Sequence, residues 1–131
     1  MILAEPRPDA RQLLGRRGEA AAERVLEAAG LRILDRRYRR RAGEIDIVAE
    51  QGAVLVFVEV KTRRGLSFGG PAAAVTRQKQ RRMARVALGY MQCRGWLDRP
   101  ARFDVVEVLA VRGSDLSVHH IEDAFRIWPT G

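Results

Sequence analysis

Two apolar segments joined by Gln51-Gly52 constrain the fold of this chain more than any other feature. Residues 43–49 and 53–62 are rich in Val and Ile, and a glycine-containing turn between such segments predicts a β-hairpin. Charged side chains nevertheless interrupt both segments where a buried sheet favours apolar residues: Glu44, Asp46, Glu59 and Lys61. Because a desolvated charge is costly unless it is paired, these side chains need either solvent or a partner.

The alternation of side chains along a strand predicts where these charges point. Glu59 and Lys61 share one strand face with Leu55 and Phe57, and Asp46 shares a face with Glu44, opposite in sense to Ile45 and Ile47. With Gln51 and Gly52 as the central turn residues, the expected pairs are Glu50 with Ala53, Asp46 with Phe57, and Glu44 with Glu59. All the charged groups then converge on one side of the hairpin, with Asp46 diagonal to Glu59.

A convergence of three carboxylates and one amine suggests a cation site. The carboxylates repel one another, Lys61 offsets one charge, and a divalent cation would offset the rest. Oxygen ligands without Cys or His suit Mg²⁺ or Mn²⁺ better than zinc. Such an ion polarises a phosphoryl oxygen and lowers the pKa of bound water, and a neighbouring lysine can orient that water or neutralise developing charge. The alternative is an ordinary solvated strand face with cross-strand ion pairs.

The remaining pattern predicts an α/β fold. Apolar residues at helical spacing predict a helix over 10–29, with Asp9 as its N-cap and Gly30 as its stop, and a second helix from Arg77 to about Met91, capped by Thr76. Strands are expected over 31–38, 102–111 and 116–121. The order helix, three strands, helix, two strands is typical of a mixed sheet flanked by helices.

Length and charge narrow the class of protein. A chain of 131 residues fits a single domain, 1–131, and we expect residues 1–9 and 127–131 to be flexible ends. The single cysteine, Cys93, excludes an internal disulfide and favours a reducing, cytoplasmic location. No apolar run approaches the length of a membrane span, so no membrane partner is expected. The net charge of +8 favours a polyanionic partner, nucleic acid first.

Several motifs together resemble a known nuclease-like family. Asp46 followed by Glu59-Val60-Lys61 resembles the Asp…Glu-X-Lys form of the PD-(D/E)XK nuclease motif, with Ile45 where the nominal motif has Pro. GEIDIVA and VFVEVKTR are similar to segments of archaeal Holliday junction resolvases, and more similar to the bacterial YraN family, also called UPF0102, whose members are predicted endonucleases. The resemblance extends from about Leu14 to Phe125 through further matching segments: GRRGE, FGGP, VTRQKQRR and RFDVVEV.

The resemblance implies a fold, a reaction and roles for individual residues. The implied fold is a restriction-endonuclease-like mixed β-sheet flanked by helices. The implied activity is Mg²⁺-dependent or Mn²⁺-dependent hydrolysis of DNA phosphodiesters, at branched or single-stranded structures. Asp46, Glu59 and the Val60 carbonyl would be metal ligands, Lys61 the catalytic lysine, and Glu19 the acidic residue that completes the site. The resolvase relatives act as dimers, which leaves a homodimer open for this chain.

The basic segments predict phosphate contacts, and two rival functions stay open. The expected nucleic-acid-binding residues flank the charged hairpin in the sequence: Arg39, Arg40, Arg41, Arg63, Gln78, Lys79 and Arg82. Phe68-Gly69-Gly70 is either a flap over the substrate or a turn. Asp104 is expected to be structural and paired with an Arg. The first rival is a non-catalytic nucleic-acid-binding module of the same fold, and the second is a role on RNA or the ribosome.

Overall fold

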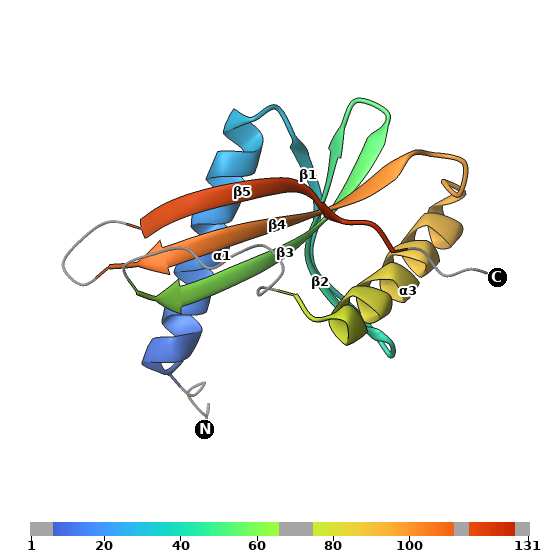
Figure 1. Ribbon diagram of the computed structural model, residues 1–131. Coiled ribbons are helices and arrows are strands. Elements are labelled where there is room, and N and C mark those ends of the chain that lie inside the picture. Colours follow the sequence, from blue (N-terminus) through green and yellow to red (C-terminus); the bar gives the residue numbers. More distant parts are fainter. Residues whose placement is uncertain (1–6, 66–74, 112–115, 128–131) are drawn as a thin grey trace, which may run out of the picture.

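The computed structural model describes residues 7–65, 75–111 and 116–127 of the chain. Within these stretches the chain forms two helices and five strands (Figure 1). In chain order they are α1 (Ala10–Ala28), β1 (Arg32–Arg40), β2 (Gly43–Gln51), β3 (Val54–Arg64), α3 (Arg77–Arg94), β4 (Ala101–Ala110) and β5 (Leu116–Phe125). The predicted Phe68-Gly69-Gly70 segment and most of the ends expected to be flexible lie outside the described residues.

The strands form one mixed sheet between the helices. Its order is β1-β2-β3-β4-β5, and every neighbouring pair is antiparallel except β3 and β4, which are parallel. Parallel neighbours need a crossover connection, and α3 lies in it. Helix α1 covers one face of the sheet and α3 the other (Figure 1). The predicted α/β class is therefore confirmed, and the arrangement is consistent with a restriction-endonuclease-like fold.

Each helix packs over a separate hydrophobic core. The core under α3 includes Phe57, Val105 and the helix residues Met83, Val86 and Tyr90, which recur at helical spacing. The core under α1 is smaller and consists mainly of aliphatic side chains: Ala22, Leu26, Leu31, Ile47, Ala49, Val56, Val58, Val106 and Val108. Because β3 contributes alternate residues to both cores, it is the central strand on which the two layers depend.

The predicted helix caps are present. The Asp9 carboxylate accepts a hydrogen bond from the Gln12 backbone N–H at 2.8 Å, and the Gln12 side chain accepts one from the Asp9 N–H, which completes a capping box. Gly30 has a φ of +93° directly after the helix, a conformation that glycine adopts without strain. Thr76 caps α3 through its hydroxyl, which accepts from the Lys79 N–H.

The predicted register of the β2–β3 hairpin is wrong by two residues. Gln51 pairs with Val54 and Val48 with Phe57, so Gly52 and Ala53, rather than Gln51 and Gly52, form the turn. Gly52 has a φ of +59° at the first central position, where such turns favour glycine. A shift of two residues does not by itself exchange the faces of a strand, but it changes the cross-strand neighbours, so Phe57 pairs with Val48 and not with Asp46.

Asp104 is buried in the first half of β4 and has the expected Arg partner. Its carboxylate accepts hydrogen bonds from Arg102, from the Asp123 backbone N–H at 2.9 Å, and lies 2.8 Å from His120 Nε2. Burial raises the pKa of this carboxyl, but the hydrogen bonds from His120, Asp123 and Arg102 outweigh burial and hold the pKa below its usual value. The network ties β5 to β4 where their register is irregular.

A close approach between α1 and β3 sets the position of the helix on the sheet. A Cβ atom added at Gly18 would lie 1.9 Å from Thr62 Oγ1, so only glycine permits this contact without movement. Gly18 is buried and precedes Glu19, while Thr62 follows Lys61. The contact therefore brings the helix segment that carries Glu19 against the strand end that carries Lys61.

This packing predicts opposite effects of the same substitution at two glycines of α1. We expect Gly18→Ala to lower the free energy of unfolding by about 1–3 kcal/mol, because the helix must move away from β3. Gly15→Ala is the control: nothing lies within 4 Å of its added Cβ, so the better helix propensity of alanine should stabilise by up to about 1 kcal/mol. Urea denaturation measures both. Equal effects at the two positions would refute the close approach.

Candidate active site

A pocket of about 310 Å³ lies between the first turns of α1 and the adjoining parts of β2 and β3. It contains every residue that the motif analysis proposed as catalytic: Glu19, Asp46, Glu59 and Lys61. Val60, the proposed third metal ligand, also lines it, as do Arg11, Leu14, Gly15 and Thr62. The sequence-based expectation that these groups lie together is met, while their roles remain predictions.

The pocket opens where β2 separates from β3. Backbone pairing between these strands runs from Gln51–Val54 to Ile47–Val58. Beyond that point the Val60 N–H donates to the Asp46 carboxylate, Oδ2, at 2.8 Å. A side chain thus takes the place of a backbone acceptor, which satisfies the amide and holds one carboxylate oxygen in a defined position.

Asp46 faces α1 because strand alternation breaks at this residue. Ile45 packs in the core under α3 and Ile47 in the core under α1, so the prediction that both share one face is wrong. The cause lies on β1, where Arg37 has a φ of +50° between the pairs Arg36–Ile47 and Tyr38–Ile45. A left-handed residue in a strand reverses the facing of the residues that follow, and β2 adjusts with its partner.

Arg37 also contacts α1 directly. Its Nε donates to Glu19 Oε2 at 3.0 Å, and the neighbouring Arg36 makes the equivalent bond to Glu23 at 2.6 Å. These bonds link β1 to successive turns of the helix. Glu19 is thereby oriented at the pocket wall by the same residue that interrupts the strand.

Glu59 is buried and its charge is partly neutralised by α3. Only 4% of the residue is exposed, and its carboxylate forms an ion pair with the Lys79 ammonium. Lys79, which was expected to contact nucleic acid, has its ammonium paired with Glu59, and its contact with nucleic acid stays a prediction. The sequence shows a lysine in the first turn of the helix that follows the strand, but this position does not by itself predict that the lysine pairs with Glu59.

Lys61 lines the pocket, whereas Glu44 lies outside it. Lys61 is exposed at the pocket, and no hydrogen bond or ion pair joins its ammonium to any described residue. Glu44 is not among the pocket residues, and its carboxylate pairs with Arg39 at 3.2 Å. The predicted convergence is therefore met at the pocket by Asp46, Glu59 and Lys61, whereas Glu44 lies outside the pocket but near enough to Asp46 to raise the pKa of that carboxyl.

The two carboxylates of the hairpin interact electrostatically. Burial, and then the charge of Glu59, raise the pKa of Asp46 from 3.8 to about 7, against the opposing effect of the Val60 N–H. Near neutral pH the pair therefore holds its full negative charge only at a cost in free energy. A nearby cation would reduce this cost.

The donor set fits a hard divalent ion that keeps part of its hydration. Among the described residues, no group of three or more His, Cys, Asp or Glu side chains is arranged to hold a metal. Asp46 and Glu59 are nevertheless close enough to share a hydrogen bond and to repel each other. Magnesium is commonly bound through one or two carboxylates, with water and phosphate oxygens completing its shell. Two carboxylates without Cys or His do not suit a structural zinc site.

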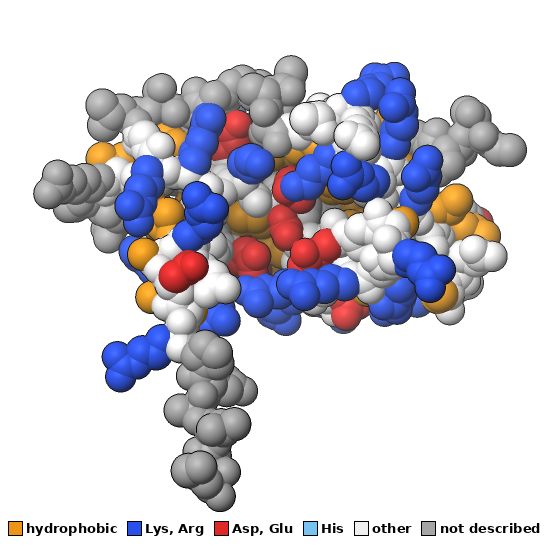
Figure 2. All heavy atoms as spheres, turned by 90° about the horizontal axis from the view of Figure 1, so that it is seen from below, with side chains coloured by type: hydrophobic (Ala, Val, Ile, Leu, Met, Phe, Trp, Pro, Cys, Tyr) orange, Lys and Arg blue, Asp and Glu red, His pale blue; other side chains and the backbone are white. Residues whose placement is uncertain are grey.

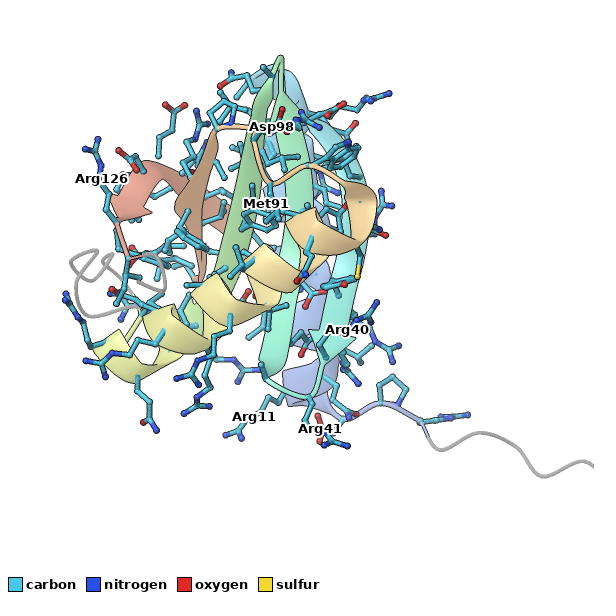
Figure 3. All side chains as sticks on the ribbon, turned by 90° about the vertical axis from the view of Figure 1, so that its right-hand side faces the viewer. Arg11, Arg40, Arg41, Met91, Asp98 and Arg126 are labelled. Carbon is cyan, nitrogen blue, oxygen red and sulfur yellow. The ribbon has the colours of Figure 1, made fainter. Side chains whose placement is uncertain are left out.

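Basic side chains surround the acidic pocket. Figure 2 shows acidic side chains gathered near the centre of one face, with Lys and Arg side chains around them. Figure 3 shows Arg11, Arg40 and Arg41 at the same end of the molecule. Of the residues expected to bind nucleic acid, most are exposed: Arg39, Arg40, Arg41, Arg63, Gln78 and Arg82. Arg11, which the sequence analysis did not single out, joins the pocket itself.

Comparison with known proteins identifies the family. The model of the family described as "Uncharacterised protein family UPF0102" matches residues 18–108. A UPF0102 protein of Symbiobacterium thermophilum is 51% identical over 112 residues, which is 86% of this chain and 95% of the relative. Those of Rhodococcus jostii and Geobacter sulfurreducens are 47% and 46% identical, over 86% and 88% of this chain and 95% and 91% of theirs.

An α/β domain with an acidic pocket at the divergence of two strands thus defines the class of protein. The chain belongs to the UPF0102 family, and the resemblance drawn from the motifs is confirmed. Within the described residues, neither helix combines the length and apolar character needed to cross a bilayer.

The raised pKa of Asp46 predicts a pH-dependent stability. The native carboxyl keeps its proton to about pH 7, whereas an unfolded one releases it near 3.8, so this contribution is complete below 3.8 and is lost as the pH rises through 7. Asp46→Asn removes the titration while retaining an acceptor for Val60. We expect the variant to gain stability relative to wild type between pH 5 and about pH 8. Urea denaturation with a chelator measures the difference, and a constant difference would contradict this account.

The left-handed conformation of Arg37 predicts a position-specific sensitivity to β-branched residues. Arg37→Val should lower the free energy of unfolding by about 1–3 kcal/mol, because valine resists positive φ. Arg36→Val is the matched control, since Arg36 makes the same kind of ion pair with α1, worth at most about 1 kcal/mol at an exposed site. Arg37→Gly should restore most of the loss. Similar losses at positions 36 and 37 in urea denaturation would exclude this role.

Proposed function

We propose that this protein is a Mg²⁺-dependent or Mn²⁺-dependent nuclease that hydrolyses DNA phosphodiesters. The observation that carries the proposal is the pocket that Glu19, Asp46, Glu59 and Lys61 line together. The Asp…Glu-X-Lys pattern adds support because it resembles the PD-(D/E)XK motif. The description of the family assigns no activity, so the proposed chemistry rests on the site.

Each residue of the pocket has a role in this proposal. Asp46 and Glu59 would hold the divalent ion, with the Val60 N–H fixing the orientation of Asp46. When bound, the ion supplies charge stabilisation at a phosphoryl oxygen and lowers the pKa of a coordinated water. The Lys61 ammonium would orient the attacking water or neutralise charge that develops on the phosphate. Glu19, oriented by Arg37, would complete the acidic wall.

The basic rim would hold the nucleic acid. Exposed guanidinium groups on the β1–β2 turn and on α3 can bind phosphates without reading sequence. Each phosphate contact contributes to a steep decline of affinity with salt, so binding should weaken strongly between low and physiological ionic strength. Branched, single-stranded and duplex DNA offer different phosphate spacings, and their competition would rank the candidate substrates.

A second candidate is a nucleic-acid-binding module that does not cleave. The Lys79 ammonium already pairs with Glu59, and the described residues contain no cluster of three metal-ligating side chains. This candidate predicts salt-sensitive binding that is unaffected by a chelator and yields no product. An RNA substrate belongs to the same comparison, because phosphate contacts alone do not distinguish the two polymers.

Cleavage by purified variants tests the proposal. We expect nicking of at least one DNA structure with Mg²⁺ or Mn²⁺, none with a chelator, and losses of at least about a hundredfold for Asp46→Asn and Lys61→Met. Glu19→Gln should reduce the rate, whereas Glu23→Gln is the matched control, since Glu23 lies one turn further along α1, pairs with Arg36 and is outside the pocket. Cleavage that persists in Asp46→Asn and Lys61→Met would reveal a contaminant. Metal-independent binding without product would favour the second candidate.

A further inference from the structure

One oxygen of a buried carboxylate on β4 has no hydrogen-bond partner among the described residues. Glu107 is 2% exposed, and its Oε2 atom is the buried side-chain oxygen or nitrogen that has no hydrogen-bond partner among the described residues. Leaving a buried polar atom unpaired costs free energy, and the cost is larger when the group is charged. Such a group persists in a protein when it has a ligand or a function that outweighs this cost.

The register of the sheet places Glu107 next to Lys61. The two residues are direct partners across the parallel β3–β4 pair. They also share a sheet face, because Phe57 and Val105 lie in the same core and each precedes its charged residue by an even number of positions. Neighbouring strands are about 4.8 Å apart, so a lysine side chain can reach a carboxylate on the adjacent strand.

The other acidic residues of this region already have partners. Asp46 accepts from the Val60 N–H, Glu59 pairs with Lys79, and Glu19 pairs with Arg37. The Lys61 ammonium is bonded to none of the described residues. An unpaired ammonium and a buried carboxylate with one unsatisfied oxygen therefore occupy adjacent positions on one face of the sheet. A rotation of the flexible lysine side chain would join them, at a cost in side-chain entropy.

We propose that Glu107 is the carboxylate that accepts the Lys61 ammonium and so positions this lysine at the candidate active site. Glu107 is too buried to contact a nucleic acid, and its negative charge would repel phosphate. It therefore acts on the reaction only through Lys61, as a positioning residue. The catalytic part of this inference rests on the proposed nuclease function, whereas the pairing itself does not.

A double-mutant cycle on stability tests the pairing without any need for activity. Glu107→Gln and Lys61→Met are made singly and together, and urea unfolding is measured with a chelator present. In wild type, Glu107→Gln should lower the stability, and so raise the unfolding equilibrium constant, because it removes the partner of Lys61. In the Lys61→Met background it should raise stability, because it removes a buried charge that has lost its partner. The coupling should reach at least about fivefold in the unfolding equilibrium constant.

Lys79 provides the matched control. Its ammonium belongs to the same site but pairs with Glu59, so Glu107→Gln should have the same effect in Lys79→Met as in wild type. Effects of Glu107→Gln and Lys61→Met that are additive within about twofold would overturn the proposal, as would an equal coupling to Lys79. If Glu107→Gln proves too unstable to measure, Glu107→Met replaces it in the same cycle with the same expected signs.

Activity assays then separate the pairing from the nuclease function. If wild type cleaves DNA, Glu107→Gln should lower kcat by at least about tenfold with little change in KM, and Glu107→Asp should restore part of the rate. A rise in KM with an unchanged kcat would contradict a positioning role. If wild type does not cleave but the coupling to Lys61 is found, the proposed function fails while the ion pair stands.

Discussion

The hydrogen bond from the Val60 N–H to the Asp46 carboxylate is the interaction on which the site depends. It lies where backbone pairing between β2 and β3 has ended, so a side chain satisfies an amide that the sheet no longer can. The same separation of strands opens the space that the pocket occupies. Structure and candidate chemistry are therefore linked at one atom: the oxygen that completes the sheet belongs to a proposed metal ligand.

Two features outside the hairpin hold this arrangement. The left-handed Arg37 interrupts alternation on the neighbouring strand, so that Asp46 faces α1 and Ile45 returns to the other core. Gly18 lets α1 approach Thr62 closely enough to form the wall that includes Glu19. One is a strained backbone conformation and the other an absent side chain. Each has a cost that the surrounding packing must outweigh.

The charges of the site are only partly compensated within the described residues. Lys79 neutralises Glu59, while Asp46 retains a raised pKa and Glu107 has an unpaired buried oxygen. A protein that needed stability alone would lower its free energy by replacing such groups with apolar ones. Their retention at one end of the sheet, close to an exposed lysine and a basic rim, is the physical argument that this region serves a function.

The sequence by itself determined the α/β class, both helices with their caps, the strand order along the chain, the family, and the set of residues that could form an acidic site. These follow from local spacing and capping, which short segments contain in full. Only the tertiary structure decided the hairpin register, the pairing of Glu44 with Arg39, the partner of Lys79 and the unsatisfied oxygen of Glu107. The physical reason is that a positive φ on one strand and a helix packed on another act across the sheet, between residues that no local pattern connects.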